Sequence, residues 1–130
     1  MSPAATLLPT IRVLIADDHQ LFQEALQAII ETDGQMAVAG LAENGLQAVE
    51  LARSLRPDIV LMDISMPVLD GIAALEQIRA ADGHACVLVL TGSDSPHDVD
   101  RARRAGAAGY VTKDRIAEEL IGAIRAIVSR

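Results

Sequence analysis

Five polar residues interrupt an otherwise apolar pattern, and their side chains suit phosphoryl chemistry assisted by a metal ion. Asp17 and Asp18 are adjacent, whereas Asp63, Thr91 and Lys113 each end or follow a separate short apolar run. Three carboxylates brought together repel one another, so one pKa rises unless a cation lies among them. We expect no histidine or cysteine among the ligands, and oxygen ligands alone favour Mg²⁺, whose open positions accept phosphate oxygens.

Asp63 is the predicted nucleophile of this group. It stands alone at the end of its run, whereas Asp17 and Asp18 are neighbours and are better placed to hold a metal. A carboxylate beside Mg²⁺ and an ammonium group can attack phosphorus and form an aspartyl phosphate. Lys113 can pair with a carboxylate or a phosphoryl oxygen, and the Thr91 hydroxyl can donate a hydrogen bond to the same phosphoryl group.

Lys113 is the only lysine among 11 basic residues, the others being arginine. One interpretation is genome composition, which would fill any cationic position with arginine. The other is that position 113 needs a compact ammonium rather than a planar guanidinium. The two interpretations differ in what they predict for the substitution Lys113→Arg.

Five short apolar runs that alternate with amphipathic segments must position these residues. The pattern predicts an α/β fold, a doubly wound five-stranded parallel sheet with helices on both faces. Ligands of such sheets bind beyond the carboxyl ends of the strands, which is where all five polar residues fall. Asn44 with Gln47 and Ser95-Pro96 resemble helix starts, and Gly34 is expected to end the first helix. The expected strands are 11–16, 36–41, 59–62, 86–90 and 109–112, and the expected helices are 19–32, 46–55, 72 to about 83, 96–105 and 116–128.

Composition narrows the class of protein. The chain has 130 residues, a formal net charge of −7 and 51% hydrophobic residues. These values fit one folded domain and argue against direct binding of nucleic acid or an anionic membrane. Aromatic residues make up 2%, which excludes a base-stacking platform. A single cysteine, Cys86, and the lack of a long apolar run predict a cytoplasmic protein with no membrane segment. We expect residues 1–10 to be a flexible leader and residues 11–130 to form the domain.

From about Ile11 to Val128, the chain closely resembles the receiver domain of two-component response regulators. The resemblance implies a (βα)5 flavodoxin-like fold with strand order 2-1-3-4-5, Mg²⁺ as cofactor and a sensor histidine kinase as phosphodonor. It also implies a phosphoacceptor signalling domain rather than an enzyme, with self-catalysed phosphoryl transfer and autodephosphorylation only. The motifs that carry the resemblance are Asp17-Asp18, Met62-Asp63 with Met66-Pro67 and Asp70-Gly71, Leu90-Thr91, and Gly106-Ala107-Ala108-Gly109-Tyr110-Val111-Thr112-Lys113.

The resemblance also implies a role for each site residue. Asp63 is the phosphoacceptor and a metal ligand, Asp18 ligates Mg²⁺ directly, and Asp17 ligates it or orients its water. The backbone carbonyl of Ser65 supplies a further ligand. Two residues contact the phosphoryl group, Thr91 and Lys113. In the implied switch, the ring of Tyr110 turns inward when Thr91 moves toward the phosphoryl oxygen.

The opening Asp17-Asp18-His19 and the pair Lys113-Asp114 are similar to the NarL/FixJ-type class, whose members usually carry a C-terminal helix-turn-helix. This implies control of transcription through a DNA-binding domain missing from this chain. One alternative is a stand-alone receiver that acts through protein–protein contacts, including contacts independent of phosphorylation. Another is an aspartate-nucleophile phosphohydrolase, which the adjacent aspartates and the short connections disfavour.

Two further expectations concern surfaces. The broad apolar faces of the first and last helices leave room for a homodimer that forms on phosphorylation. We interpret His19, His84 and His97 as solvated or helix-capping side chains, not as ligands or phosphodonors.

Overall fold

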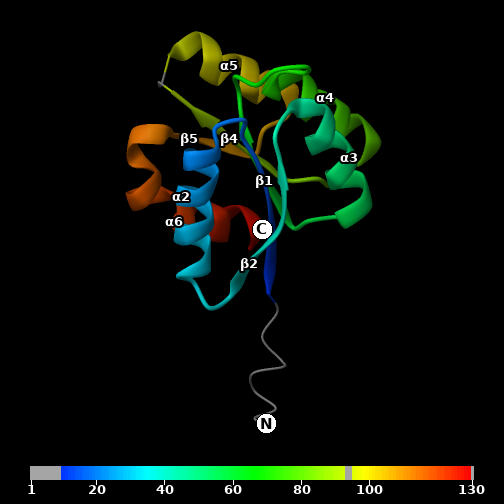
Figure 1. Ribbon diagram of the computed structural model, residues 1–130. Coiled ribbons are helices and arrows are strands. Elements are labelled where there is room, and N and C mark those ends of the chain that lie inside the picture. The colour runs from blue at the N-terminus through cyan, green and yellow to red at the C-terminus, as the bar shows by residue number, and fades with distance from the viewer. Residues whose placement is uncertain (1–9, 93–94, 130) are drawn as a thin grey trace.

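The computed structural model describes residues 10–92 and 95–129, which form a parallel sheet with helices on both faces (Figure 1). The strand order is β2-β1-β3-β4-β5, so the predicted fold class and topology are confirmed. The strands are β1 (Ile11–Ala16), β2 (Met36–Ala42), β3 (Ile59–Asp63), β4 (Val87–Thr91) and β5 (Gly109–Thr112). The helices are α2 (Gln20–Glu31), α3 (Gly45–Leu55), α4 (Gly71–Ala81), α5 (Pro96–Ala105), the short 3₁₀ turn η1 (Lys113–Arg115) and α6 (Ile116–Val128).

The sheet is buried on both faces. Every residue of β3 and β4 is buried, as expected for central parallel strands that are covered on each side. Helices α2 and α6 pack on one face, and α3, α4 and α5 pack on the other (Figure 1). Helix α5 buries only Ala102, which agrees with its mostly polar sequence and makes it the most lightly anchored of the five α-helices.

The predicted boundaries of the helices and strands agree with the structure within about two residues. β4 begins at Val87 rather than Cys86 and includes Thr91. Gly34 does not end α2 through a left-handed turn. The helix ends at Thr32, whose backbone is right-handed, and among the described glycines only Gly106 has a positive φ. The predicted cap of α3 is confirmed, since Asn44 Oδ1 accepts a hydrogen bond of 2.9 Å from the Gln47 amide.

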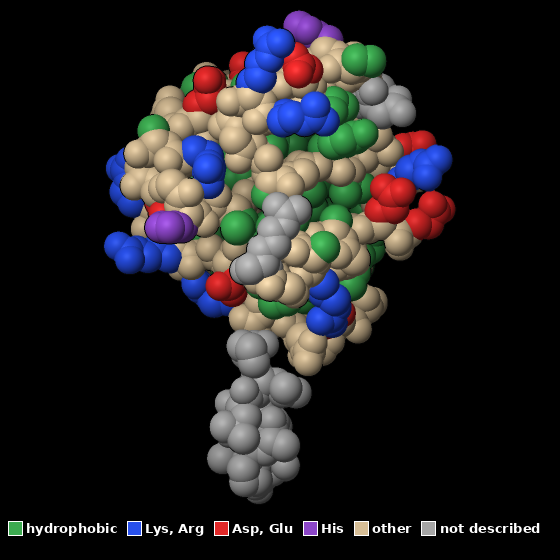
Figure 2. Space-filling view, turned by 180° about the vertical axis from the view of Figure 1, so that it is seen from behind, with side chains coloured by type: hydrophobic (Ala, Val, Ile, Leu, Met, Phe, Trp, Pro, Cys, Tyr) green, Lys and Arg blue, Asp and Glu red, His purple; other side chains and the backbone are tan. Residues whose placement is uncertain are grey.

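One face of the molecule carries charged side chains of both signs. Figure 2 shows basic and acidic side chains interspersed over the face opposite to that of Figure 1, with apolar side chains between them. Binding to a polyanion would need a large basic patch, and this face shows none (Figure 2). Within the described residues, no helix combines the length and apolar character needed to cross a membrane. The expected leader at residues 1–10 is not tested, since residues 1–9 lie outside the described part of the chain.

Candidate functional site

The predicted site residues meet at one edge of the sheet. Asp17 follows β1 directly, Asp63 and Thr91 are the last residues of β3 and β4, and Lys113 follows β5. Parallel pairing places these strand ends side by side, with Asp63 opposite Leu90 and Thr91 opposite Thr112. The structure therefore brings together residues that are up to 96 positions apart in the sequence.

Lys113 bridges two buried carboxylates. Its Nζ lies 3.4 Å from Asp17 Oδ2 and 3.3 Å from Asp63 Oδ2, and its side chain is 26% exposed. Asp17 is fully buried and Asp63 is 3% exposed. Buried carboxylates are costly unless a cation compensates them, so Lys113 is part of what allows both acids to lie inside the protein.

Lys113 also contacts an aromatic ring. Its Nζ lies 4.5 Å from the centroid of the Phe22 ring, a cation–π geometry that restrains the ammonium group. Phe22, the only phenylalanine in the chain, had no predicted role. The position of Phe22 in the first turn of α2 follows from helical spacing. Its contact with Lys113, which follows β5, depends on the order of the strands in the sheet.

Asp63 combines an unsatisfied oxygen with a perturbed pKa. Its buried Oδ2 makes no hydrogen bond within the described residues, although it forms an ion pair with Lys113, whose Nζ lies 3.3 Å away. Burial raises the pKa of Asp63 above its usual range, Lys113 opposes that rise, and the charge of Asp17 adds to it. A buried carboxylate oxygen that makes no hydrogen bond can bind a metal cation or form a covalent bond without first losing such a bond.

Asp17 is oriented by the start of α2. Its Oδ1 accepts a hydrogen bond of 2.8 Å from the backbone N–H of His19. The buried Gln23 donates from Nε2 to the carbonyl oxygens of Asp17 and Ala42, at 2.6 and 3.1 Å. Gln23 thereby ties the ends of β1 and β2 to α2. Sequence reasoning missed it, and a polar residue on an apolar helix face was the signal that could have found it.

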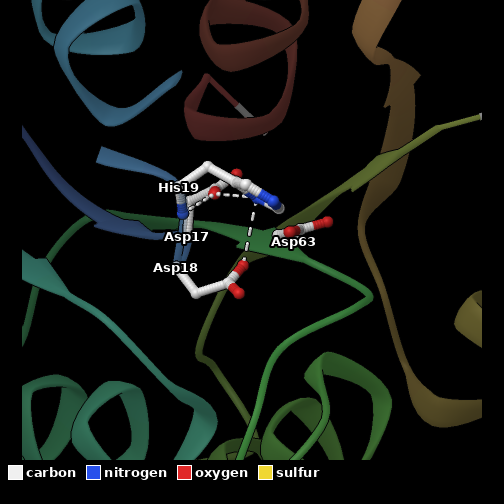
Figure 3. A group of neighbouring side chains, drawn as sticks. All are labelled: Asp17, Asp18, His19 and Asp63. Carbon is white, nitrogen blue, oxygen red and sulfur yellow. Dashed lines mark hydrogen bonds and ion pairs between the residues drawn. The ribbon is translucent and has the colours of Figure 1, made fainter. Parts of the chain in front are cut away.

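His19 belongs to the acidic group, contrary to the expectation that no histidine lies near it. Its Nδ1 lies 3.4 Å from Asp17 Oδ1 and 3.2 Å from Asp18 Oδ1. One donor atom from each of Asp17, Asp18, His19 and Asp63 lies within 4.8 Å of the other three. Figure 3 shows the four side chains turned toward one another.

The loop after β3 approaches Asp63 closely. The Ser65 N–H donates a long hydrogen bond of 3.4 Å to Asp63 Oδ1. Gly71 begins α4 so near this strand that a Cβ there would lie 2.0 Å from the Asp63 carbonyl oxygen. Asp70 caps α4 by accepting from the Ala73 N–H at 2.9 Å. The Asp70-Gly71 pair therefore sets where the helix starts relative to Asp63.

Thr91 and Tyr110 lie on neighbouring strands and differ in exposure. Thr91 is 1% exposed at the end of β4, whereas Tyr110 in β5 is 42% exposed. The register pairs Tyr110 with Val89, two residues before Thr91. The ring of Tyr110 is thus on the outer edge of the sheet and is not part of the acidic group.

The donor set fits a hard divalent cation. Asp17, Asp18 and Asp63 supply carboxylate oxygens, and Asp63 Oδ2 makes no hydrogen bond within the described residues that would prevent it from binding a cation. With Lys113 counted, the three carboxylates leave two negative charges in excess, which one divalent ion would balance. The Asp18 side chain, 29% exposed, leaves the group accessible to solvent.

Comparison with known proteins agrees with this arrangement. The family model for the response regulator receiver domain matches residues 13–125. The uncharacterized transcriptional regulatory protein YxjL of Bacillus subtilis is 41% identical over 89% of this chain and 53% of its own length. The nitrate/nitrite response regulator NarL of Escherichia coli is 35% identical over 86% of this chain and 52% of its length. The solved signal receiver domain of the putative response regulator NarL from Mycobacterium tuberculosis superposes with a TM-score of 0.88 at 32% identity, over 93% of this chain and 98% of that one.

Proposed function

This chain belongs to the receiver domains of response regulators, and we propose that Asp63 is the residue that accepts the phosphoryl group. The observation that carries the proposal is the buried Oδ2 of Asp63, which makes no hydrogen bond within the described residues and forms an ion pair with Lys113 Nζ at 3.3 Å. An acceptor left unsatisfied in the interior is costly, so its retention points to chemistry at that atom.

In the proposed transfer, an Asp63 carboxylate oxygen forms a bond to phosphorus as the donor's bond to phosphorus breaks. The donor group leaves with the electron pair, and the product is an acyl phosphate on Asp63. The reacting form is the ionised carboxylate, which Lys113 favours against the effect of burial. Lys113 can then pair with a phosphoryl oxygen in place of the lost carboxylate charge.

Mg²⁺ is the cofactor that the family generally uses, and Asp17, Asp18, Asp63 and the Ser65 carbonyl are the proposed ligands. When bound, the ion would neutralise charge between carboxylate and phosphoryl oxygens. Asp17 is already fixed by its bond from the His19 N–H, and Asp18 is accessible enough to bind without disrupting the core.

The proposed switch connects this site to β5. A phosphoryl group adds about −1.5 to −2 charges and three acceptors, which the Thr91 hydroxyl can contact from the end of β4. Movement of Thr91 frees space that the half-exposed Tyr110 can enter. Helix α5 follows β4 in the chain and buries only Ala102, so it can shift together with Thr91 and Tyr110.

The output is proposed from the relatives. The chain spans about half the length of the curated relatives it matches, and these include proteins named as transcriptional regulators. We propose that the whole protein receives its phosphoryl group from a sensor histidine kinase in the cytoplasm and acts on DNA through a C-terminal helix-turn-helix domain. The receiver itself, with its net charge of −7, would leave DNA contact to that domain.

The test is phosphorylation by a small acyl phosphate or phosphoramidate with Mg²⁺, followed by intact-mass analysis. We expect the wild-type chain to gain one phosphoryl group and Asp63→Asn to gain none. Asp114→Asn is the matched control, since Asp114 is an exposed aspartate beside Lys113. Phosphorylation of Asp63→Asn at the wild-type rate would overturn the assignment of Asp63.

A further inference from the structure

The imidazole of His19 lies against the acidic group, with Nδ1 at ion-pair distance from two carboxylates. His19 occupies the N-cap position of α2, but its side chain makes no capping hydrogen bond. The ring is 67% exposed, so packing does not force it toward the carboxylates. Of the two predicted roles for His19, the solvated side chain agrees with the structure, whereas the side chain does not cap α2.

The ring instead points at the same space as the carboxylates. Figure 3 shows the imidazole directed toward Asp63 and away from the helix that it precedes. Nδ1 lies 3.2 Å from Asp18 Oδ1 and 3.4 Å from Asp17 Oδ1. Ligands at about 2.1 Å from one octahedral ion are separated by about 3.0 Å when adjacent and by about 4.2 Å when opposite. The separations around His19 fit that range with small adjustments.

A second, independent observation indicates that a cation belongs in this space. Asp63 is 3% exposed, and its Oδ2 makes no hydrogen bond within the described chain. Asp63 is also a member of the four-residue group that includes His19. The site therefore offers three carboxylates and one nitrogen donor, rather than oxygen donors alone.

Nitrogen and oxygen donors select different ions. Mg²⁺ is bound through oxygen and gains little from an imidazole, whereas Ni²⁺ and Zn²⁺ bind imidazole nitrogen well. We propose that His19 is a fourth ligand that raises the affinity of the acidic site for borderline transition-metal ions such as Ni²⁺ and Zn²⁺. The proposal rests on the proposed function only in taking Asp17, Asp18 and Asp63 as the metal site.

The consequence is competition between two kinds of ion at one position. Mg²⁺ would be held by the carboxylates with His19 outside its coordination sphere. Ni²⁺ or Zn²⁺ would engage the carboxylates together with Nδ1 of His19. His19 thereby sets which ions displace Mg²⁺, a property that Asp17, Asp18 and Asp63 alone do not define.

Isothermal titration of the whole chain with Ni²⁺ and, separately, with Mg²⁺ tests the proposal. We expect His19→Ala to weaken Ni²⁺ binding by about tenfold or more, because loss of a group that merely supports a metal ligand already costs about 10–100-fold. Mg²⁺ binding should change less than about twofold. His19→Gln, which keeps a polar side chain, should behave like His19→Ala.

Two controls separate the outcomes. His84→Ala removes another exposed histidine, close before β4 at the opposite edge of the sheet, and should leave both affinities unchanged. Asp18→Asn should weaken Ni²⁺ and Mg²⁺ alike. Equal Ni²⁺ affinity in wild type and His19→Ala, with normal Mg²⁺ binding, would overturn the role of His19 and leave the proposed function intact. Failure of the wild-type chain to bind either ion would overturn both.

Discussion

Asp63 carries a free-energy cost in the unphosphorylated protein that its replacement should relieve. Burial raises the pKa of this carboxyl, so the folded state binds its proton more tightly than the unfolded state does. Stability is then lost as pH rises from the unfolded value of about 3.8 through the higher folded value. At neutral pH, ionisation of Asp63 therefore costs the folded state more free energy than it costs the unfolded chain.

Asp63→Asn should therefore raise the free energy of unfolding at pH 7 by about 1 kcal/mol in the absence of divalent ions. Lys113 keeps Asp17 as its partner in this variant. The gain should shrink as pH falls through the folded pKa of Asp63 toward the unfolded value of about 3.8, and little of it should remain below that value. Urea unfolding with a chelator at pH 7 and pH 3.5 measures it, and a less stable variant at pH 7 would contradict the argument.

Lys113 is the residue for which composition and chemistry gave competing explanations. Its ammonium fits between Asp17 and Asp63 at 3.4 and 3.3 Å and lies over the Phe22 ring. A guanidinium is larger and planar, so it cannot occupy the same point without displacing one of these three groups. The contacts favour the interpretation that this position needs a compact cation.

Lys113→Arg should slow Mg²⁺-dependent phosphorylation by roughly tenfold to a hundredfold, the effect of misplacing a contact group by about 1 Å. The reverse change at the neighbouring exposed residue, Arg115→Lys, is the control and should alter the rate little, since its partner Glu119 is also exposed. The initial rate of mass gain with a small phosphodonor is the measurement. Equal rates for wild type and Lys113→Arg would restore genome composition as the whole explanation.

At the scale of elements, the start of α4 controls the backbone of the nucleophilic strand. Gly71 N donates to the Ile64 carbonyl at 2.8 Å, and a Cβ at Gly71 would meet the Asp63 carbonyl oxygen at 2.0 Å. The helix can begin there only if residue 71 has no side chain. Asp70-Gly71 is one of the motifs shared with receiver domains, and this close approach gives a physical reason for the glycine.

Gly71→Ala should cost about 2–4 kcal/mol of stability, since backbone rather than a flexible side chain must move. It should also lower the phosphorylation rate, because the displaced backbone carries Asp63. Gly83→Ala is a matched control, as a Cβ there meets nothing within 4 Å. Thermal unfolding and phosphorylation rate are compared for both variants. A Gly71→Ala protein as stable as Gly83→Ala would show that the loop can move away at little cost.

At the scale of the whole molecule, the fold and the site differ in how far they follow from sequence. Strand ends could be predicted, because apolar runs stop where Asp17, Asp63 and Thr91 stand, and parallel topology then places these ends together. Side-chain contacts between elements that are distant in sequence could not be predicted, because they depend on the order of the strands in the sheet. Phe22 meets Lys113 and Gln23 meets Ala42 only once α2 has packed beside β1, and periodicity carries no information on such pairs.

His19 shows the same limit from the opposite direction. A histidine before a helix is usually a cap or a solvated residue, and the sequence offered no reason to choose otherwise. The orientation of its ring depends on Asp18 next to it and on Asp63, which lies two strands along the chain. Local rules fix where such a residue stands, and tertiary structure decides what it faces.

Binding of Mg²⁺ at the strand ends should stabilise the entire domain, because the ligands come from β1 and β3 and are assembled only in the folded state. A ligand that binds only the folded state adds about 2.7 kcal/mol at a concentration 100 times its dissociation constant. The urea midpoint of the wild-type chain should therefore rise with Mg²⁺ concentration. Asp18→Asn should reduce that rise, whereas its stability without metal should change little, since Asp18 is partly exposed and lies outside the core. Titrations at matched ionic strength with NaCl remove general screening from the comparison. An equal rise in wild type and Asp18→Asn would place the stabilising ion elsewhere on this acidic chain, and the strand-end carboxylates would then lose their assignment as the metal site.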